Sequence, residues 1–209
     1  MCFNDCLCYN FFDYTVQNLI MIYGVCYLLG ALPFGVLIAK LFGKDIFKIG
    51  SGSTGFTNVK RAVGLWPALV VLLLDFAKGY AATSLAAHYL PAQYELIVIG
   101  GLLAVIGHSL SIFIKFKGGK GAATGVGIVA FIDWRIFLIV AVSVFLIVKF
   151  LRIQSVGTIV GLWLTTLLFF IFQVPQAYLI ASLIANVFIM YTHRQNIVRL
   201  IQGKENRIA

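Results

Sequence analysis

Residues 121–150 read GAATGVGIVAFIDWRIFLIVAVSVFLIVKF, and the fold depends on how this stretch is divided. A transmembrane helix needs roughly 20 apolar residues, so the stretch is long enough for one helix or for two short ones. The polar run Asp133-Trp134-Arg135 interrupts it near the middle. A turn at this run predicts a short helix over 121–132 and a second helix that ends near Phe150.

The composition of the whole chain is that of a membrane protein. Of its 209 residues, 61% are hydrophobic and only 11% are charged, which excludes an ordinary soluble domain. Further candidate spans cover residues 16–42, 65–87, 96–114, 156–172 and 175–191. With two helices in 121–150 the total is seven. We therefore predict an all-α integral membrane protein, a bundle of about seven transmembrane helices that forms a single membrane-embedded domain over residues 1–209.

The distribution of basic residues favours seven spans over six. With seven, Arg135 is the only basic residue in the gaps on one side of the membrane. The gaps on the other side contain Lys44, Lys48, Lys60, Arg61, Lys115, Lys117, Lys120, Lys149, Arg152, Arg194, Arg199, Lys204 and Arg207. By the positive-inside rule this side is cytoplasmic, so the C-terminus is cytoplasmic and the N-terminus, with Asp5 and Asp13, lies outside. The net charge of +9 reflects this orientation and does not by itself identify a substrate.

The N-terminal segment suggests neither a cleaved signal nor a metal site. No Lys or Arg precedes Lys40, so the positive flank of a secretory signal is missing and we expect the first helix to be retained. The cysteines lack the paired spacing of a zinc site, so we expect no metal. They are Cys2, Cys6, Cys8 and Cys26.

The first of three cytoplasmic segments suited to phosphate is GSGSTGFTNVKR, residues 50–61. Its closely spaced glycines allow successive backbone N–H groups to converge on an anion. Ser51, Thr57 and Asn58 add neutral polar groups, and Arg61 can bind a phosphate through two hydrogen bonds. The alternative is a flexible Gly/Ser linker, which rarely carries Thr-Asn followed by two cations.

The second segment is KFKGGKGAATG, residues 115–125, at the start of the short helix over 121–132. A glycine loop that leads into a helix N-terminus presents unpaired N–H groups and a positive dipole end to an anion. We therefore place Gly118, Gly119, Lys120 and Gly121 among the substrate-binding residues. The sequence has no GxxxxGK[ST] motif, so nucleotide hydrolysis is not expected. The alternative is a basic loop that contacts lipid headgroups.

The third segment is HRQNIVR, residues 193–199, followed by GKE at 203–205. On a helix, His193, Asn196 and Arg199 share one face and form a polar stripe that points back at the protein. The alternative is an amphipathic basic tail on the membrane surface.

Polar residues inside the predicted spans form a separate group. Asp75 and Lys78 are three positions apart on one helix and can pair, as a structural or a catalytic pair. His108 follows Gly107 in the third span, and packing with a hydrogen bond is favoured over a direct substrate role. Gly100, Gly101, Ala104 and Gly107 predict close helix packing.

Together the three segments resemble a known family. In order and spacing, residues 50–61, Gly107-His108 through 116–121, and 193–199 with 203–205 are similar to three motifs of the bacterial acyl-phosphate:glycerol-3-phosphate acyltransferases, the PlsY family. The likeness covers nearly the whole chain. The family usually has Asn in place of Ser53, Ala in place of Phe56 and Phe-Pro in place of Leu110-Ser111, and these departures bear on loop shape or acyl-donor preference.

The resemblance implies an activity and a location. A fatty acyl group would pass from acyl phosphate to the 1-hydroxyl of glycerol 3-phosphate, which is an early step of phospholipid biosynthesis. The enzyme would lie in the bacterial inner membrane with its active site facing the cytoplasm. It would use no cofactor, metal or nucleic acid. Its partners would be the two substrates, membrane lipid and, as a further expectation, the enzyme that supplies acyl phosphate.

The resemblance also implies roles for the site residues. Ser51, Arg61 and Lys120 would hold the phosphate of glycerol 3-phosphate. His193 and Asn196 would be the catalytic pair that positions the glycerol portion, with Arg199 in support. The loop over 118–121 and Thr57 are assigned to the acyl-phosphate end. His193 is the only plausible side-chain base, but a phosphate oxygen of the substrate could accept the proton instead.

Two other functional classes fit the sequence less well. Acyl-CoA-dependent acyltransferases with His and Asp five positions apart are disfavoured, because His88, His108 and His193 all lack Asp at that offset. A transporter of a phosphorylated metabolite could use the same cations as a selectivity site. Against it, the cations lie in loops at one side of the membrane, and no inverted repeat is visible.

Overall fold

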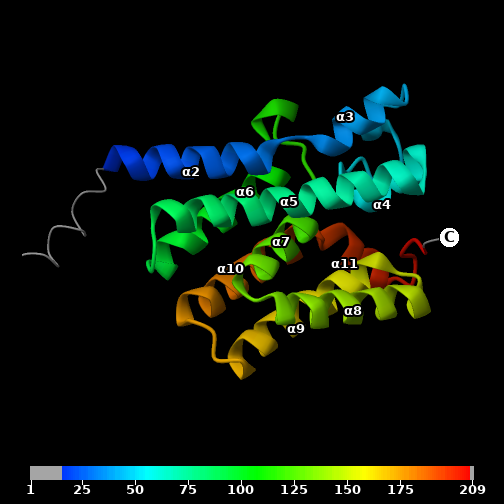
Figure 1. Ribbon diagram of the computed structural model, residues 1–209. Coiled ribbons are helices and arrows are strands. Elements are labelled where there is room, and N and C mark those ends of the chain that lie inside the picture. Colours follow the sequence, from blue (N-terminus) through cyan, green and yellow to red (C-terminus); the bar gives the residue numbers. More distant parts are fainter. Residues whose placement is uncertain (1–15, 208–209) are drawn as a thin grey trace, which may run out of the picture.

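The computed structural model describes residues 16–207, and every regular element in that range is a helix (Figure 1). The predictions about the acidic N-terminus and three of the cysteines concern Asp5, Asp13, Cys2, Cys6 and Cys8, which lie outside the described residues. The elements are α2 (Val16–Ala31), α3 (Phe34–Leu41), η1 (Ile46–Lys48), α4 (Phe56–Val63), α5 (Leu65–Tyr89), α6 (Tyr94–Ser109), η2 (Ile112–Ile114), α7 (Ala122–Ile132), α8 (Trp134–Leu151), α9 (Gln154–Ile171), α10 (Gln176–Thr192) and α11 (Arg194–Ile201).

The apolar helices are those of a multi-pass membrane protein. Within the described range, five segments are long and apolar enough to cross a bilayer, and they are Val16–Leu41, Leu65–Tyr89, Tyr94–Ile114, Trp134–Leu151 and Gln154–Ile171. The apolar helices α7 and α10 are shorter. Because these two fall below the usual length of a span, the count of seven stays a prediction.

The stretch over 121–150 divides into two helices, as predicted. α7 ends at Ile132 and α8 begins at Trp134. The Asp133 carboxylate caps α8 by accepting hydrogen bonds from the backbone N–H groups of Arg135 at 2.8 Å and Ile136 at 3.4 Å. A carboxylate at this position satisfies N–H groups that have no partner inside the helix and favours the helix dipole.

The first predicted span, over 16–42, is not one continuous helix. It is broken at Leu32 and Pro33 into α2 and α3. Proline has no backbone N–H, its ring clashes with the preceding turn, and it disfavours the helical conformation of the residue before it. The Leu32 carbonyl at the break accepts a hydrogen bond from the Lys78 ammonium group of α5 at 3.1 Å.

Small residues allow α6 to pack closely against its neighbours, as its sequence predicts. A side chain at Gly107 would overlap the α2 backbone at Tyr27. A Cβ atom at Gly101 would lie 2.8 Å from the Thr83 hydroxyl of α5 and 3.1 Å from the Ile128 side chain of α7. Residues larger than glycine would therefore force these helices apart.

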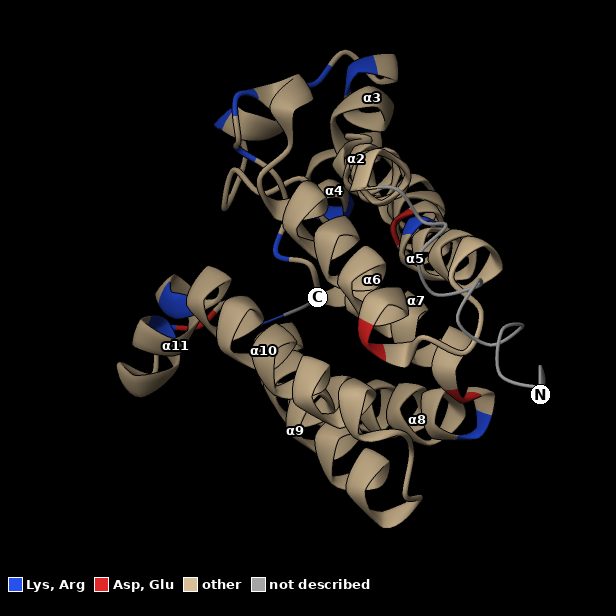
Figure 2. Ribbon diagram, turned by 90° about the vertical axis from the view of Figure 1, so that its left-hand side faces the viewer, with Lys and Arg blue, Asp and Glu red and all other residues tan. Residues whose placement is uncertain are grey.

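The helices form two groups. α6 packs against α2 and α5, and α5 packs against α7, while α9 packs against both α8 and α10. Contacts of α7 with α8, and of α10 with α6, join the groups. Figure 1 shows α3, α4 and α11 at the same end of the bundle. In Figure 2 most Lys and Arg positions gather around these three helices.

Candidate active site

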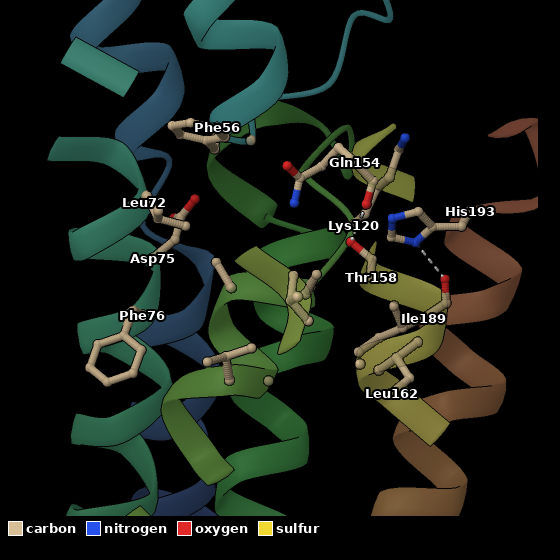
Figure 3. Close-up of a pocket in the computed structure, with 18 of the residues that line it drawn as sticks. Phe56, Leu72, Asp75, Phe76, Lys120, Gln154, Thr158, Leu162, Ile189 and His193 are labelled. Carbon is tan, nitrogen blue, oxygen red and sulfur yellow. Dashed lines mark hydrogen bonds between the residues drawn. The ribbon is translucent and has the colours of Figure 1, made fainter. Parts of the chain in front are cut away.

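A cavity of about 960 Å³ lies between the two groups of helices. Its polar lining includes Ser51, Thr57, Asn58, Arg61, Lys120, Thr158, His193, Asn196, Arg199 and Glu205. Its apolar lining includes Leu69, Phe76, Val129, Val140, Phe169 and Tyr178. Figure 3 shows Lys120, Gln154, Thr158 and His193 around one part of the cavity, with Phe76 and Leu162 further along it. The cavity therefore joins a cationic end to a long apolar space.

Asn58 fixes the glycine-rich segment that precedes α4. Its amide nitrogen donates hydrogen bonds to the carbonyls of Ile46 at 3.2 Å and Ser53 at 2.9 Å, and its amide oxygen accepts the N–H of Ser51 at 3.1 Å. Gly50 has a φ of +54°, and a Cβ there would overlap the Asn58 amide oxygen. Because these hydrogen bonds use both the nitrogen and the oxygen of its amide, the contacts of Asn58 support the loop that carries Ser51.

Thr57 and Arg61 lie on α4 and, with Ser51, line the cavity. Within residues 16–207 the Arg61 guanidinium makes no hydrogen bond or ion pair with another residue. A guanidinium group can bind two phosphate oxygens at once. Because Arg61 has no such partner in the described part of the chain, it is available to an anion at this end of the cavity.

The two glycines of the second segment pack against the end of α6. The N–H of Gly118 donates to the Ser109 carbonyl at 3.0 Å, and the N–H of Gly119 donates to the His108 carbonyl at 3.0 Å. A side chain at Gly119 would overlap the His108 ring. Neither glycine lines the cavity, whereas the next two residues, Lys120 and Gly121, do. The glycines thus place Lys120, and their own N–H groups are already paired.

Lys120 joins the second segment to the third. Its ammonium group donates a hydrogen bond to the Asn196 side-chain oxygen, and its carbonyl accepts one from the Thr192 hydroxyl at 2.9 Å. Burial, followed by the positive charge of Arg199, lowers the pKa of Lys120 to about 8. An anionic ligand would stabilise the charged form of this lysine and offset the solvation that it loses on burial.

His193 lies between α10 and α11 with 5% of its surface exposed. Its Nδ1 is 2.9 Å from the Ile189 carbonyl, which can only accept, so Nδ1 carries the proton and Nε2 is unprotonated (Figure 3). Burial lowers the pKa of His193 to about 4, so the ring is neutral near pH 7. Nε2 is therefore a hydrogen-bond acceptor at the cavity.

Glu205 organises the third segment, and the sequence-based site prediction did not include it. Its carboxylate accepts hydrogen bonds from Asn196 at 2.6 Å, from Arg199 at 2.7 Å and from Ser155 of α9 at 3.2 Å. Although burial acts in the opposite direction, these bonds lower the pKa of Glu205, so it is ionised near pH 7. The only signal in the sequence was its place in the third motif, beyond Gly203, whose φ is +66°.

Asp75, Lys78 and His108 form a second charged cluster, inside the bundle. The Lys78 ammonium group is 2.9 Å from the Asp75 carboxylate, which confirms the predicted pairing. His108 Nδ1 is 3.5 Å from the same carboxylate oxygen. All three side chains are buried, and Asp75 and His108 also line the cavity. The cluster thus extends from the interior of the bundle to the wall of the cavity.

One side of the cavity faces the surroundings of the bundle. Leu65 and Leu73 of α5 and Phe145 of α8 line the cavity and expose 46%, 65% and 64% of their surface, respectively. In a bilayer such apolar residues contact lipid tails. The apolar part of the cavity is therefore accessible from the membrane.

The chain matches one family along most of its length. The family profile described as glycerol-3-phosphate acyltransferase matches residues 20–203. A glycerol-3-phosphate acyltransferase from Prochlorococcus marinus strain MIT 9312 is 41% identical over 197 residues, which cover 92% of this chain and 98% of the relative. Another, from Shouchella clausii strain KSM-K16, is 37% identical over 189 residues, which cover 88% of this chain and 92% of the relative.

Two solved structures have the same fold. One is a crystal structure of PlsY (YgiH), an integral membrane glycerol 3-phosphate acyltransferase, in its glycerol 3-phosphate form, with a TM-score of 0.88 and 34% sequence identity. It covers 91% of this chain and 96% of its own. The other is the lysophosphatidic acid form, with a TM-score of 0.86 and 34% identity, covering 91% of this chain and 95% of its own.

Proposed function

The protein belongs to the glycerol-3-phosphate acyltransferase family, and we propose that it transfers a fatty acyl group from acyl phosphate to the 1-hydroxyl of sn-glycerol 3-phosphate. The products are 1-acyl-sn-glycerol 3-phosphate, which is lysophosphatidate, and inorganic phosphate. The family resemblance seen in the sequence is thus confirmed, and the transporter hypothesis has no separate observation in its favour.

The observation that carries the proposal is the joining of two environments in one cavity. The charges of Arg61, Arg199 and Glu205 all act on Lys120, so three cations and one of the carboxylates that line the cavity lie near one another. This excess of positive charge offsets the repulsion between two phosphate groups brought together. The apolar space leading from it takes the acyl chain, and its opening toward lipid suits a substrate and a product that reside in the membrane.

The proposed roles of the side chains follow the family resemblance. Ser51, Arg61 and Lys120 hold the phosphate of glycerol 3-phosphate, and His193 and Asn196 position its glycerol portion with support from Arg199. Thr57 and the loop over 118–121 serve the acyl-phosphate end. Because the N–H groups of Gly118 and Gly119 are paired with α6, the glycines would act by placing Lys120 and Gly121.

The reaction needs positioning more than a strong base. The 1-oxygen of glycerol 3-phosphate attacks the acyl carbonyl carbon, the carbon–oxygen bond to phosphate breaks, and phosphate leaves with that electron pair. Correct orientation of two bound reactants can lower such a barrier by about 7–11 kcal/mol. The proton of the attacking hydroxyl passes to Nε2 of His193 or to a phosphate oxygen of the substrate. A histidine with a pKa of about 4 is a weak base, so His193 serves first as the acceptor that aims the hydroxyl.

We also propose that the chain is a single membrane-embedded domain that crosses the bacterial inner membrane seven times. The N-terminus would lie outside, with the C-terminus and the active site cytoplasmic. The concentration of Lys and Arg around α3, α4 and α11 supports this orientation (Figure 2). A contact with the enzyme that supplies acyl phosphate would then form at this end.

The test is an assay of phosphate release by the purified protein in lipid mesophase or detergent. Acyl phosphate with glycerol 3-phosphate should release phosphate and form 1-acylglycerol 3-phosphate, whereas acyl-CoA or acyl-carrier protein should not replace the donor. Absence of release with acyl phosphate would overturn the proposal. Flux of glycerol 3-phosphate into proteoliposomes without phosphate release would favour a transporter.

His193→Ala separates the two fates of the proton. If His193 is an obligatory base, turnover is lost while glycerol 3-phosphate still binds in a calorimetric titration. If the substrate phosphate accepts the proton, substantial turnover remains. We expect substantial residual turnover, because a histidine with a pKa of about 4 is a weak base and a phosphate oxygen of the substrate can accept the proton instead.

A further inference from the structure

The loop that carries Lys120 rests on the ring of His108. Gly118 and Gly119 pair with the last carbonyls of α6, and the Cα atom of Gly119 lies against the edge of the His108 ring that carries Nε2. Any side chain at residue 119 would overlap this ring. The ring is thus a support that sets how far the loop can approach α6, and Lys120 is the next residue along the chain.

The ring is itself held from behind. His108 Nδ1 is 3.5 Å from Asp75 Oδ1, and the same oxygen is 2.9 Å from the Lys78 ammonium group. Lys78 also donates to the Leu32 carbonyl, at the break between α2 and α3. A charged group costs several kcal/mol inside a membrane unless it is paired, so this arrangement has few alternative geometries. The cluster fixes the ring with respect to α5 and to the break between α2 and α3.

We propose that His108, oriented by Asp75, is a positioning residue that determines where Lys120 meets the phosphate of glycerol 3-phosphate. It acts through the backbone of Gly119. The inference rests on the proposed function, because it assigns the phosphate of glycerol 3-phosphate to Lys120. It predicts a larger effect on glycerol 3-phosphate than on acyl phosphate, because Lys120, the residue next to the support, is assigned to glycerol 3-phosphate.

The first experiment removes the support. In His108→Ala the Asp75–Lys78 pair remains, but the loop loses its backing. The KM for glycerol 3-phosphate should rise about tenfold or more, because small displacements of a binding group are costly, and the KM for acyl phosphate should rise by a smaller factor. Asp75→Asn, which loosens the ring without removing it, should shift the same KM in the same direction by a smaller factor.

The second experiment tests the geometry through a double-mutant cycle. Gly119→Ala alone puts a methyl group into the His108 ring and should also raise the KM for glycerol 3-phosphate. In His108→Ala combined with Gly119→Ala, the methyl group occupies space that the ring has left. The double variant should therefore have a lower KM for glycerol 3-phosphate than Gly119→Ala alone. Two independent effects would instead multiply.

The matched control is Thr83→Ala on α5. Thr83 is fully buried and donates to the Gly79 carbonyl of its own helix, and it does not line the cavity. This variant should lower thermal stability somewhat while leaving both KM values unchanged. It measures the effect of losing a buried polar group on the helix that carries Asp75, without touching the support of the loop.

The outcomes separate the inference from the function on which it rests. If wild-type protein neither turns over acyl phosphate with glycerol 3-phosphate nor is thermally stabilised by glycerol 3-phosphate, the proposed function fails. If wild type is active but His108→Ala behaves like Thr83→Ala, the inference fails. If His108→Ala does not fold, the comparison of Gly119→Ala with the double variant decides, and multiplied effects overturn the inference.

Discussion

The protein contains two clusters of charged side chains that differ in how their charges are balanced. Inside the bundle, Asp75 is paired with Lys78 and backed by His108, and these side chains are at most 6% exposed. At the end of the cavity, the acid Glu205 faces the cations Arg61, Lys120 and Arg199. A closed pair satisfies the fold by itself, whereas a surplus of cations, of which Lys120 and Arg199 are partly buried, is completed by an anion. The difference distinguishes charges that maintain the structure from charges that bind substrate.

We call the group at the end of the cavity, which comprises Arg61, Lys120, Arg199 and Glu205, the open cluster. The largest effect should come from removing one of its positive charges. Lys120→Met deletes the ammonium group proposed to bind phosphate and should lower kcat/KM by about 10³-fold, as for loss of a charge-stabilising donor. The thermal unfolding temperature should change little, because Lys120 has no ion pair among residues 16–207. Lys117→Met makes the same change at an exposed position of the same loop and should leave kcat/KM unaltered. An equal loss of kcat/KM in Lys120→Met and Lys117→Met would show that Lys120 has no special role in substrate binding.

We call the buried group of Asp75, Lys78 and His108 the closed cluster. Breaking its ion pair should lower the free energy of unfolding. Lys78→Met leaves the Asp75 carboxylate buried beside His108 alone and should cost about 3 kcal/mol of unfolding free energy. Combining Lys78→Met with Asp75→Asn should recover part of this loss, because no unpaired charge then remains. Thermal unfolding in a single detergent measures both. A single variant as stable as wild type would show that the pair contributes nothing to the fold.

Glu205 belongs to the open cluster but has a supporting part in it. Glu205→Ala leaves the Asn196 amide, the Arg199 guanidinium and the Ser155 hydroxyl without their common acceptor. We expect about 2 kcal/mol of destabilisation, because hydrogen bonds to charged groups are worth about 1.5–3 kcal/mol each but these are partly exposed to solvent. Glu205→Gln keeps one acceptor oxygen, which can serve Asn196 and Ser155 but not Arg199 as well, so it should keep part of the stability. Thermal unfolding distinguishes the two, and equal losses would show that the charge matters more than the hydrogen bonds.

Much of the fold could be predicted from the sequence because it depends on local patterns. Apolar length gives the helices, and Asp133 ends one helix and caps the next. The break at Pro33 was not predicted, because the apolar run around it is long enough for a single span. An apolar run shows where a chain can cross a membrane, and the proline shows where its helix stops.

The site was predicted less completely, because its organisation depends on residues far apart in the chain. Lys120 and Asn196 were each placed in a motif, and the structure brings them together across 76 positions. The contact of Glu205 with Ser155, across 50 positions, follows no local spacing. The packing of Gly119 on His108 was likewise hidden, since a glycine loop with free N–H groups and one with paired N–H groups have the same sequence pattern.

The smallest expected effect is a dependence of the KM for glycerol 3-phosphate on pH, which comes from Lys120 of the open cluster. Because the pKa of Lys120 is lowered to about 8, the lysine is charged below this pH and neutral above it. The KM for glycerol 3-phosphate should therefore rise about tenfold between about pH 7 and about pH 9, while the phosphate of the substrate, with a second pKa of about 6, stays mainly dianionic.

The assignment of this rise to Lys120 follows from its neighbours. The groups that face it are the guanidiniums of Arg61 and Arg199, Glu205 and His193. Guanidinium groups stay charged, and the pKa values of Glu205 and His193 are lowered, so none of these four changes charge in this range. Lys120→Arg should keep its charge and abolish the rise, even if its KM is higher throughout. Since bound substrate favours the charged lysine, kcat should show the alkaline change at a higher pH than kcat/KM does. If the KM of Lys120→Arg still rises over this range, another group is titrating. The lowered pKa of Lys120 would then not distinguish the open cluster from the closed one.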